Sequence, residues 1–339
     1  MRVRELDDSL ACAWDAFVSA HPGGTFFHLS GWRHVLQNAL GHRPHYLLAE
    51  QDGAVCGVLP LVHTRSWLFG NNLSSLAFSA HAGPLAREPE AIAQLYAAAS
   101  RHGHELAVGA IEYRLPAPSG MPRVTKHLYE TFSKPIYADA DANMQAIRSK
   151  QRNVIRKGIK NGLLGRLGDL PSFYAVYAES VRNLGTPVFP RRLFEAISAT
   201  FGDAVELVIA ELAGRPISAA MNFYFREQVC PYYWGGTYAA RSLNGNDFLA
   251  WEIIARAAAR GCTLFDFGRS KRDTGPYQWK LNLGFEPTPL FYEYELVGAS
   301  AMPDINPMNP KYRLFIDGWK RLPLPVASVI GPWLSRSLG

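Results

Sequence analysis

The 339-residue sequence has few cysteines and no long apolar run. Its four cysteines are widely separated and form no CxxC pair, which argues against a disulfide framework or a zinc knuckle. No window of 18 residues is both apolar and uncharged, so we expect no transmembrane helix. The first residues lack an uninterrupted apolar core and include Asp7 and Asp8. We therefore expect no signal peptide and a cytoplasmic protein.

Several catalytic and metal-binding patterns are also missing. The sequence holds no Ser-x-x-Lys, Gly-x-Ser-x-Gly or P-loop pattern. His42 with His45, and His102 with His104, are spaced like metal ligands, but no acid or cysteine completes either set in the sequence. We therefore expect no metal site, and a loop or core position for each histidine.

Positive charge is concentrated in the second part of the chain. Residues 1–147 hold 11 Lys or Arg and 13 Asp or Glu, whereas residues 148–339 hold 24 and 16. A basic half suggests an anionic partner, such as a phosphate-bearing donor, a nucleic acid end or a membrane surface. Composition alone fits a solvated basic surface as well.

The order of predicted elements repeats. In the first half, the patterns predict helices at 10–19 and 31–40, a hairpin at 45–66, a strand at 73–78, a helix at 88–102 and a strand at 106–113. In the second half, they predict helices at 171–184 and 190–200, strands within 205–236, a helix at 246–260 capped by Asn246, and a strand from 264 that Gly268 ends. The repeat predicts two α/β domains with mixed sheets, because one core rarely grows past about 250–300 residues.

The segment 263–296 carries the clearest site signal. A buried strand is followed by Arg269, Ser270 and Lys271, and a basic loop at the carboxyl end of a strand commonly meets anionic ligands. A short helix then spans 277–283, with Gly284 placed to end it, and a strand follows at 291–296.

A second basic cluster covers residues 148–166, where seven Lys or Arg occur with no acid. On a helix, Arg152, Arg156 and Lys160 would share one face, where like charges repel. Lys157 lies beside them. Guanidinium groups suit phosphate, so we interpret the cluster as a phosphate-binding surface at the domain junction. The alternative is a solvated helix face.

Residues 298–339 form a tail rich in proline, which leaves room for only one good helix, at 312–320. The apolar side chains beyond residue 321 predict that the tail packs on the body or touches a membrane or partner. We expect any peripheral membrane contact to lie within 322–339.

Four stretches together resemble the FemAB-like proteins associated with PEP-CTERM/exosortase systems: residues 41–86, 149–163, 264–297 and 309–339. The resemblance implies two tandem GNAT-like acyltransferase domains, at 1–145 and 146–297, followed by the tail at 298–339. Fem-type enzymes transfer an aminoacyl group from aminoacyl-tRNA to an amine on a cell-wall precursor. The exosortase-associated branch implies a role in envelope or exopolysaccharide biogenesis.

The resemblance also places a functional lysine in the helix at 277–283, and Lys280 is the candidate. A fixed cation near the oxyanion of acyl transfer can contribute about 10²–10³ in rate. Tyr277 lies three residues earlier and can share its face, although a core aromatic is the alternative. Arg241 is a candidate donor contact and His81 a candidate acceptor contact.

Three functions remain open on the sequence. The first is a Fem-type acyl- or aminoacyl-transferase that binds the acceptor end of a tRNA. The second is an acyl-CoA-dependent N-acyltransferase, although the CoA turn expected between Arg241 and Gly245 has a degenerate glycine pattern. The third is a non-catalytic protein that keeps the fold for binding or scaffolding. No tightly bound cofactor is expected in any of them.

Overall fold

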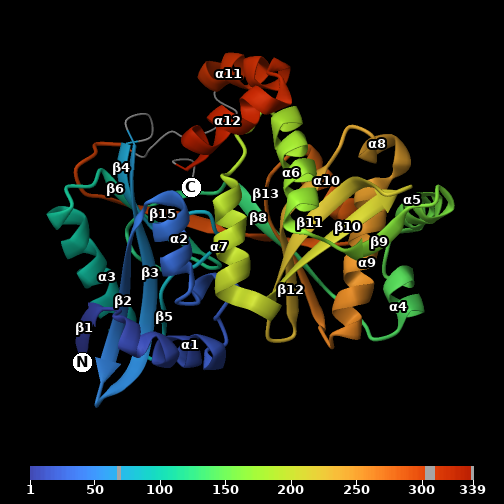
Figure 1. The fold of residues 1–339 in the computed structure, drawn as a ribbon. Coiled ribbons are helices and arrows are strands. Elements are labelled where there is room, and N and C mark those ends of the chain that lie inside the picture. Colours follow the sequence, from blue (N-terminus) through green and yellow to red (C-terminus); the bar gives the residue numbers. More distant parts are fainter. Residues whose placement is uncertain (67–69, 302–309, 337–339) are drawn as a thin grey trace. The chain divides into compact units, whose positions relative to one another are not determined.

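The computed structural model describes residues 1–66, 70–301 and 310–336. The chain divides into two compact units, each built around one sheet (Figure 1). Unit 1 holds the described residues of 1–129, 289–306 and 336–339, and unit 2 those of 130–288 and 307–335.

Unit 1 contains three α-helices and most of the N-terminal strands. Its elements are β1 (Arg2–Glu5), a 3-10 turn (Asp8–Leu10), α1 (Ala11–Ala20), a second 3-10 turn (Phe26–His28), α2 (Trp32–Leu40), β2 (Arg43–Gln51), β3 (Ala54–Ser66), β4 (Gly70–Ser75), β5 (Leu85–Ala86), α3 (Pro89–Glu105), β6 (Ala110–Leu115), β7 (Val124–Lys126) and β15 (Phe291–Leu296). The sheet order is β1-β2-β3-β4-β6-β15-β7, with β5 beside β3.

Alternation along the strands gives this sheet two apolar faces. Leu47 on β2 packs with Leu95 of α3 in one core, whereas the neighbouring Tyr46 stacks on Trp14 of α1 with ring centroids 5.2 Å apart. Successive side chains of a strand point to opposite faces. Helix α3 therefore covers one face, and α1 packs on the other.

Unit 2 contains most of the helices. Its elements are β8 (Tyr129–Pro135), α4 (Ala140–Gln145), α5 (Ser149–Lys160), β9 (Leu164–Leu167), α6 (Leu170–Leu184), α7 (Arg191–Phe201), a 3-10 turn (Gly202–Ala204), β10 (Val205–Leu212), β11 (Arg215–Phe225), β12 (Gln228–Gly236), α8 (Ala240–Leu243), α9 (Gly245–Ala259), β13 (Leu264–Lys271), α10 (Gly275–Asn282), β14 (Glu286–Pro289), α11 (Pro310–Arg321) and α12 (Leu324–Ser335). The sheet order is β14-β8-β13-β12-β11-β10-β9.

Helices cover both faces of this sheet as well. On one face, Ile253 of α9 belongs to a buried core with Phe265 of β13. On the other, Phe194 of α7 contacts Tyr177 of α6 and Tyr233 of β12, with ring centroids 5.2 and 5.0 Å apart. Edge-to-face contacts of this kind add to the stability that burial provides.

The predicted fold class is confirmed. Each sheet contains two antiparallel strands, then a helix, then a strand parallel to the second: β3-β4-α3-β6 in unit 1 and β11-β12-α9-β13 in unit 2. The repeated element order seen in the sequence corresponds to this shared topology.

The residue ranges of the two units differ from the predicted ranges, which had boundaries at 145 and 297. Strand β15 lies between β6 and β7 and pairs antiparallel with both, so it belongs to unit 1. Strand β8 lies beside β13 in the sheet of unit 2. Element order alone does not indicate which strands a distant strand pairs with, because the pairing is decided by contacts between residues far apart in the chain.

Three local predictions need correction. Strand β13 continues through Gly268, which has a φ of +62°. Helix α9 begins one residue early, after Asn244, and Asn246 accepts a hydrogen bond from Trp234 instead of capping the helix. The tail forms two helices, because Pro325 lies in the first turn of α12, where an N–H is not needed.

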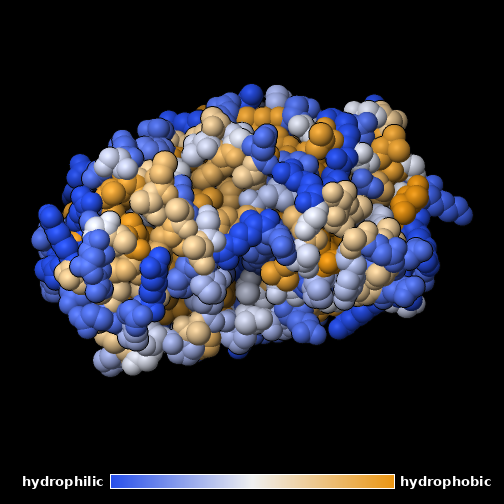
Figure 2. All heavy atoms as spheres, turned by 90° about the horizontal axis from the view of Figure 1, so that it is seen from below, coloured by the Kyte–Doolittle hydropathy of each residue, from blue (hydrophilic) through white to orange (hydrophobic). Residues whose placement is uncertain are grey.

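Tail residues 302–309 and 337–339 lie outside the described residues, and α11 and α12 both lie against α6 in Figure 1. Within the described ranges, no helix has the length and apolar character needed to cross a membrane. Figure 2 shows hydrophilic residues mixed with small apolar groups on one face of the molecule.

The role of β15 predicts how fragments behave. Residues 1–145 alone lack the strand that pairs with β6 from Phe291↔Leu115 to Leu296↔Ala110. We expect this fragment to lack a cooperative thermal transition by circular dichroism, because an unpaired central strand leaves its N–H and C=O groups unsatisfied. Fusing residues 289–297 through a glycine-serine linker should restore the transition, whereas a scrambled copy should not. A cooperatively folded 1–145 fragment would contradict the requirement for β15 in the sheet of unit 1.

Candidate active site in unit 2

The candidate site lies where two parallel strands of unit 2 begin side by side and then line a cavity. The pairing of β12 with β13 joins Gln228 to Leu264 and Val229 to Phe265. The residues that follow on both strands line a cavity of about 1020 Å³. Ligands of open α/β sheets commonly bind outside the carboxyl ends of parallel strands.

The cavity wall is built from five parts of unit 2. Its lining residues come from α6, β12, the α8 region with the start of α9, β13 with α10, and α11: Tyr177, Ser180, Val181, Asn183, Leu184, Pro231, Tyr232, Tyr233, Trp234, Gly236, Thr237, Tyr238, Ala240, Arg241, Asn246, Phe267, Gly268, Arg269, Ser270, Gly275, Pro276, Trp279, Lys280 and Lys320.

The charge of this wall has one sign. Four lining residues are cationic: Arg241, Arg269, Lys280 and Lys320. Among the lining residues in the described part of the chain, none is Asp or Glu. Low-dielectric walls strengthen the field of such a cluster, so the cavity is suited to an anionic ligand.

Lys280 is held by three consecutive carbonyls. Its Nζ donates to the carbonyl oxygens of Phe267, Gly268 and Arg269 at 2.7, 3.0 and 3.3 Å. In a regular strand, successive carbonyls alternate in direction. The left-handed φ of Gly268 interrupts this alternation, so we attribute the convergence of the three oxygens on one ammonium to this residue.

Lys280 is buried, with only 5% of the residue exposed. Burial lowers the pKa of Lys280 to about 7, and the charge of Asp266 opposes this shift. Both the ammonium and the neutral amine are therefore accessible near neutral pH. An ammonium has three donors, and the three carbonyls use all of them.

An aromatic wall stands beside Lys280, and the sequence analysis did not assign it to the site. The Trp234 and Trp279 rings meet with centroids 5.4 Å apart. The Trp279 Nε1 donates to Asp247 at 2.7 Å, and the Trp234 Nε1 donates to Asn246 at 3.1 Å. Both indoles are thereby fixed at the start of α9. In the sequence, the aromatic run at 232–234 could have indicated this wall.

The predicted site residues separate into two groups. Arg241, Arg269, Ser270 and Lys280 line the cavity, whereas Lys271 is not among the lining residues. Tyr277 is not among them either, and its hydroxyl donates to Glu130 at 2.6 Å. This hydrogen bond to a carboxylate is the main reason that the pKa of Tyr277 is raised.

Most of the basic cluster of 148–166 lies on α5, and none of its residues is among the lining residues of this cavity. Arg152 donates to the carbonyl oxygens of Gln145, the last residue of α4, and Ile147, which precedes α5. Arg156, Lys157 and Lys160 are exposed. The last three are therefore available to a ligand that extends over the surface of α5.

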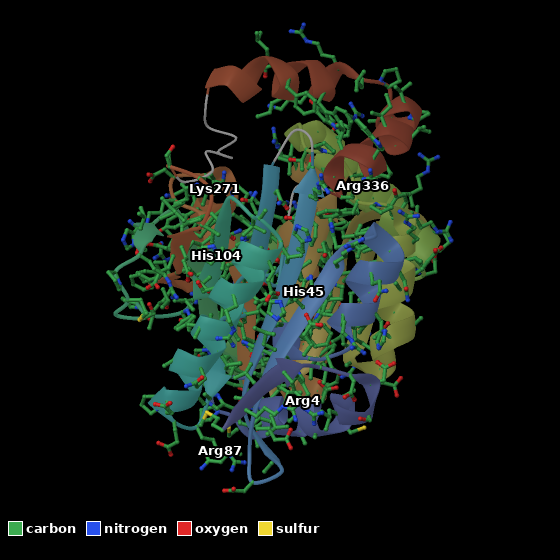
Figure 3. The ribbon with its side chains drawn as sticks, turned by 90° about the vertical axis from the view of Figure 1, so that its left-hand side faces the viewer. Arg4, His45, Arg87, His104, Lys271 and Arg336 are labelled. Carbon is green, nitrogen blue, oxygen red and sulfur yellow. The ribbon has the colours of Figure 1, made fainter. Side chains whose placement is uncertain are left out.

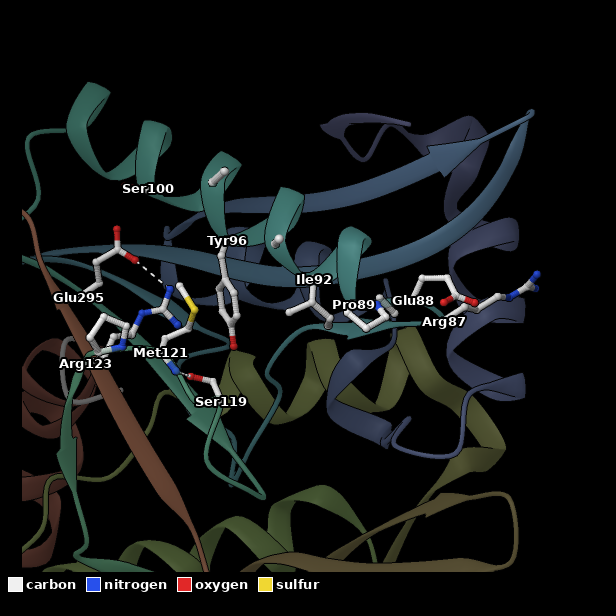
Figure 4. A pocket seen from close by; sticks show the side chains of 14 residues that line it. Arg87, Glu88, Pro89, Ile92, Tyr96, Ser100, Ser119, Met121, Arg123 and Glu295 are labelled. Carbon is white, nitrogen blue, oxygen red and sulfur yellow. Dashed lines mark hydrogen bonds and ion pairs between the residues drawn. The ribbon is translucent and has the colours of Figure 1, made fainter.

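Unit 1 has a cavity of its own, of about 830 Å³, beside α3 (Figure 4). There Arg123 forms an ion pair with Glu295 at 3.1 Å and lies over the Tyr96 ring, 4.0 Å from its centroid. Its cation is thus already neutralised and covered. His81 lines neither of these two cavities.

The fold joins one histidine of each pair, His45 and His102, to the acid Glu5, a combination that the spacing in the sequence did not indicate. Glu5 of β1 lies beside His45 of β2 (labelled in Figure 3), with Oε1 2.6 Å from Nδ1. His102 of α3 completes a group whose potential ligand atoms all lie within 4.8 Å. The hydrogen bond from His45 is the main cause of the lowered pKa of Glu5. These contacts connect β1, β2 and α3, and the sequence could not show them because the three residues are far apart in the chain.

Gly268 provides a stability test of the Lys280 cradle. We expect Gly268→Ala to lower the free energy of unfolding by about 1–2 kcal/mol, because a left-handed conformation has that cost for an L-residue. The nearest atom to an added Cβ is 3.6 Å away on Tyr232, so the loss would arise from the backbone.

Gly275 is a matched control for this measurement by urea denaturation. An added Cβ there meets nothing within 4 Å, and the residue is not among the glycines with positive φ. Equal losses for Gly268→Ala and Gly275→Ala would show that the conformation of Gly268 has no special cost.

Comparison with known proteins places this site in a family context. Residues 143–281 match the family model described as "Acetyltransferase (GNAT) domain". That range includes most of the cavity-lining residues, Lys280 among them. No curated protein matches the chain in sequence.

Solved structures share the fold over most of the chain. FemX has a TM-score of 0.65 at 15% identity, with 86% of this chain and 97% of that chain covered. L-PGS from Bacillus licheniformis has a TM-score of 0.57 at 13% identity, covering 99% and 98%. A tandem GNAT protein from the clavulanic acid biosynthesis pathway has a TM-score of 0.55 at 12% identity, covering 88% and 99%. The chain therefore has a tandem GNAT fold, and its second unit contains the segment that matches the GNAT acetyltransferase domain.

Proposed function

We propose that the cavity of unit 2 is the active site of a Fem-type acyl- or aminoacyl-transferase. It would modify an amine on an envelope or exopolysaccharide precursor. The observation that carries the proposal is a cavity with four cationic lining residues and no acidic one. Donors of such groups carry phosphate, which guanidinium groups bind through paired hydrogen bonds. The match of residues 143–281 to a GNAT acetyltransferase domain supports the reaction class.

The reaction needs a place for negative charge. The acceptor amine attacks the carbonyl carbon of the donor, a C–N bond forms, and the carbonyl oxygen becomes an oxyanion. The intermediate then releases the donor's oxygen or sulfur, while the amine loses its proton to the leaving group or to solvent. A cation close to the oxyanion stabilises this intermediate more than the ground state.

Lys280 is the cation we assign to this task. Its hydrogen bond to the Arg269 carbonyl is the longest of the three, at 3.3 Å, and the one nearest to solvent. Exchanging this bond for the oxyanion leaves the bonds to Phe267 and Gly268 in place. The ammonium thus stays anchored while one donor turns to the substrate. Tyr277, through Glu130, would help to position α10, which carries Lys280.

Lys280→Met should lower kcat and kcat/KM together, on the order of 10²-fold, because the interaction that is removed acts mainly in the transition state. Removal of the donor also leaves buried carbonyls without a partner, so we expect about 1–3 kcal/mol lower stability. Thermal denaturation of the variant, run beside the kinetic assay, shows whether the enzyme is folded at the assay temperature.

The pH dependence distinguishes the two protonation states of Lys280. Since the ammonium is the active form in this mechanism, kcat/KM should fall as the pH rises through about 7. Lys280→Arg should recover only part of the activity and should lose this decline, because a guanidinium does not titrate there. A wild-type rate that increases through the same range would mean that the neutral amine acts as a base, and would overturn the oxyanion role.

The donor can be an aminoacyl-tRNA or an acyl-CoA, and the two differ in reach. Both carry phosphates that Arg241 and Arg269 can meet in the cavity. A tRNA carries many more phosphates than coenzyme A and would contact Arg156, Lys157 and Lys160 on α5 as well. We favour aminoacyl-tRNA, because the exposed α5 cations have no acid among their neighbours in the sequence from 148 to 166.

Two sets of variants test the donor by binding of aminoacyl-tRNA and of coenzyme A over a range of salt. Arg241→Gln with Arg269→Gln should weaken both ligands. Replacing Arg156, Lys157 and Lys160 by Gln should weaken tRNA alone and reduce its salt slope by about 0.7–0.9 for each phosphate that the protein no longer neutralises. If the α5 variant binds tRNA like the wild type, the solvated-face interpretation is correct and the CoA alternative gains support.

A non-catalytic binding or scaffold protein is the remaining alternative. In such a protein, side chains could fill the cavity. The cavity beside Lys280 instead has an open volume of about 1020 Å³, which leaves room for a substrate. Mass spectrometry of ligands that copurify with the protein separates these functions, because a donor or its product indicates an enzyme. The PEP-CTERM/exosortase setting and an acceptor contact at His81 belong to the same proposal.

A further inference from the structure

Helix α12 of unit 2 presents its large apolar side chains to solvent. Val326, Val329, Ile330 and Trp333 are 41%, 78%, 42% and 62% exposed. They follow the spacing i, i+3, i+4 and i+7, so they lie along one face of the helix. We call these four residues the α12 apolar face.

The opposite face of α12 is made of small residues. Ala327, Gly331 and Ser335 are buried at i, i+4 and i+8. A Cβ on Gly331 would lie 2.9 Å from the backbone nitrogen of Val188, so the helix backbone sits close against this part of unit 2. Rotating α12 to bury its large side chains would force them into that narrow space. The exposure of the large apolar side chains therefore follows from the way α12 packs on unit 2.

Charge around this face is positive. Lys320 and Arg321, which end α11, are exposed, and Asp317 is the last acidic residue of the chain. Helix α11 adds two more exposed apolar residues, Leu314 at 85% and Phe315 at 46%. An apolar helical face with a Trp and basic neighbours is typical of helices that lie in the plane of a membrane interface.

We propose that the α12 apolar face docks on an anionic lipid bilayer, with the indole of Trp333 at the headgroup boundary. Apolar side chains would enter the interface, while the exposed Arg321 meets the negative surface potential. A second copy of the chain is less well matched, because the same basic residues would face each other across a symmetric contact. The docking is independent of the acyl-transfer proposal and can hold if that one fails.

Cosedimentation of the full chain with vesicles tests the docking directly. We expect binding to vesicles that contain phosphatidylglycerol, and several-fold weaker binding to pure phosphatidylcholine. Replacing Val329, Ile330 and Trp333 by Ser should weaken binding at least about tenfold, since their apolar surface is removed. Leu164→Ser with Leu167→Ser is the matched control, because these residues of β9 are 64% and 59% exposed and lie outside the proposed face. The control should bind like the wild type.

Trp333 also provides a positional readout that a merely destabilised variant would not mimic. Vesicles of brominated phosphatidylglycerol should quench part of the wild-type tryptophan fluorescence. Trp333→Phe should still cosediment but lose that quenched part. Arg321→Gln should weaken binding to anionic vesicles several-fold at low salt.

Three outcomes would overturn the docking. The first is absence of binding to anionic vesicles. The second is equal loss of binding in the β9 control. The third is a protein that ignores vesicles but forms a dimer, in light scattering, that the triple Ser variant abolishes. That last result would assign the face to a second copy of the chain.

Discussion

The candidate site depends on how one buried ammonium is held. Taking Lys280 out of water disfavours its charge, and three backbone carbonyls in succession compensate for that cost. They converge where Gly268 departs from regular strand geometry. The same bend places Arg269 and Ser270 at the cavity wall. One left-handed residue thus links the fold of β13 to the electrostatics of the cavity.

The acidic side chains beside the site are held by hydrogen bonds to other side chains. Two acids beside the site accept hydrogen bonds from neighbouring side chains: Asp247 accepts from Trp279, and Glu130 accepts from Tyr277. Burial is the main cause of the raised pKa of Asp247. Because no Asp or Glu is among the described lining residues, the field of the cavity wall favours an incoming anion.

The sheet of unit 1 depends on β15, a strand that is distant in sequence from its other strands. Strand β15 follows α10 and β14 of unit 2 in the chain, yet it pairs within the sheet of unit 1. The segment that carries Lys280 therefore continues into a strand that stabilises the other unit. Such non-local pairing is slow to form and strongly specified once formed, because a register slip by one residue would reverse both faces of the strand.

Most of the local structure and the fold class could be predicted from the amino-acid sequence alone. Hydrophobic periodicity and turn residues have short range, so they predicted α1, α3, α6, the β2–β3 hairpin and the helix that carries Lys280. The sequence also identified Arg241, Arg269, Ser270 and Lys280, which the fold brings to one cavity. Tertiary packing set the remaining features. It buried Lys280 rather than exposing it, directed Tyr277 to Glu130, and joined Glu5 to His45 and His102. Each of these contacts connects residues whose separation along the chain carries no periodic signal, so only the packed fold could bring them together.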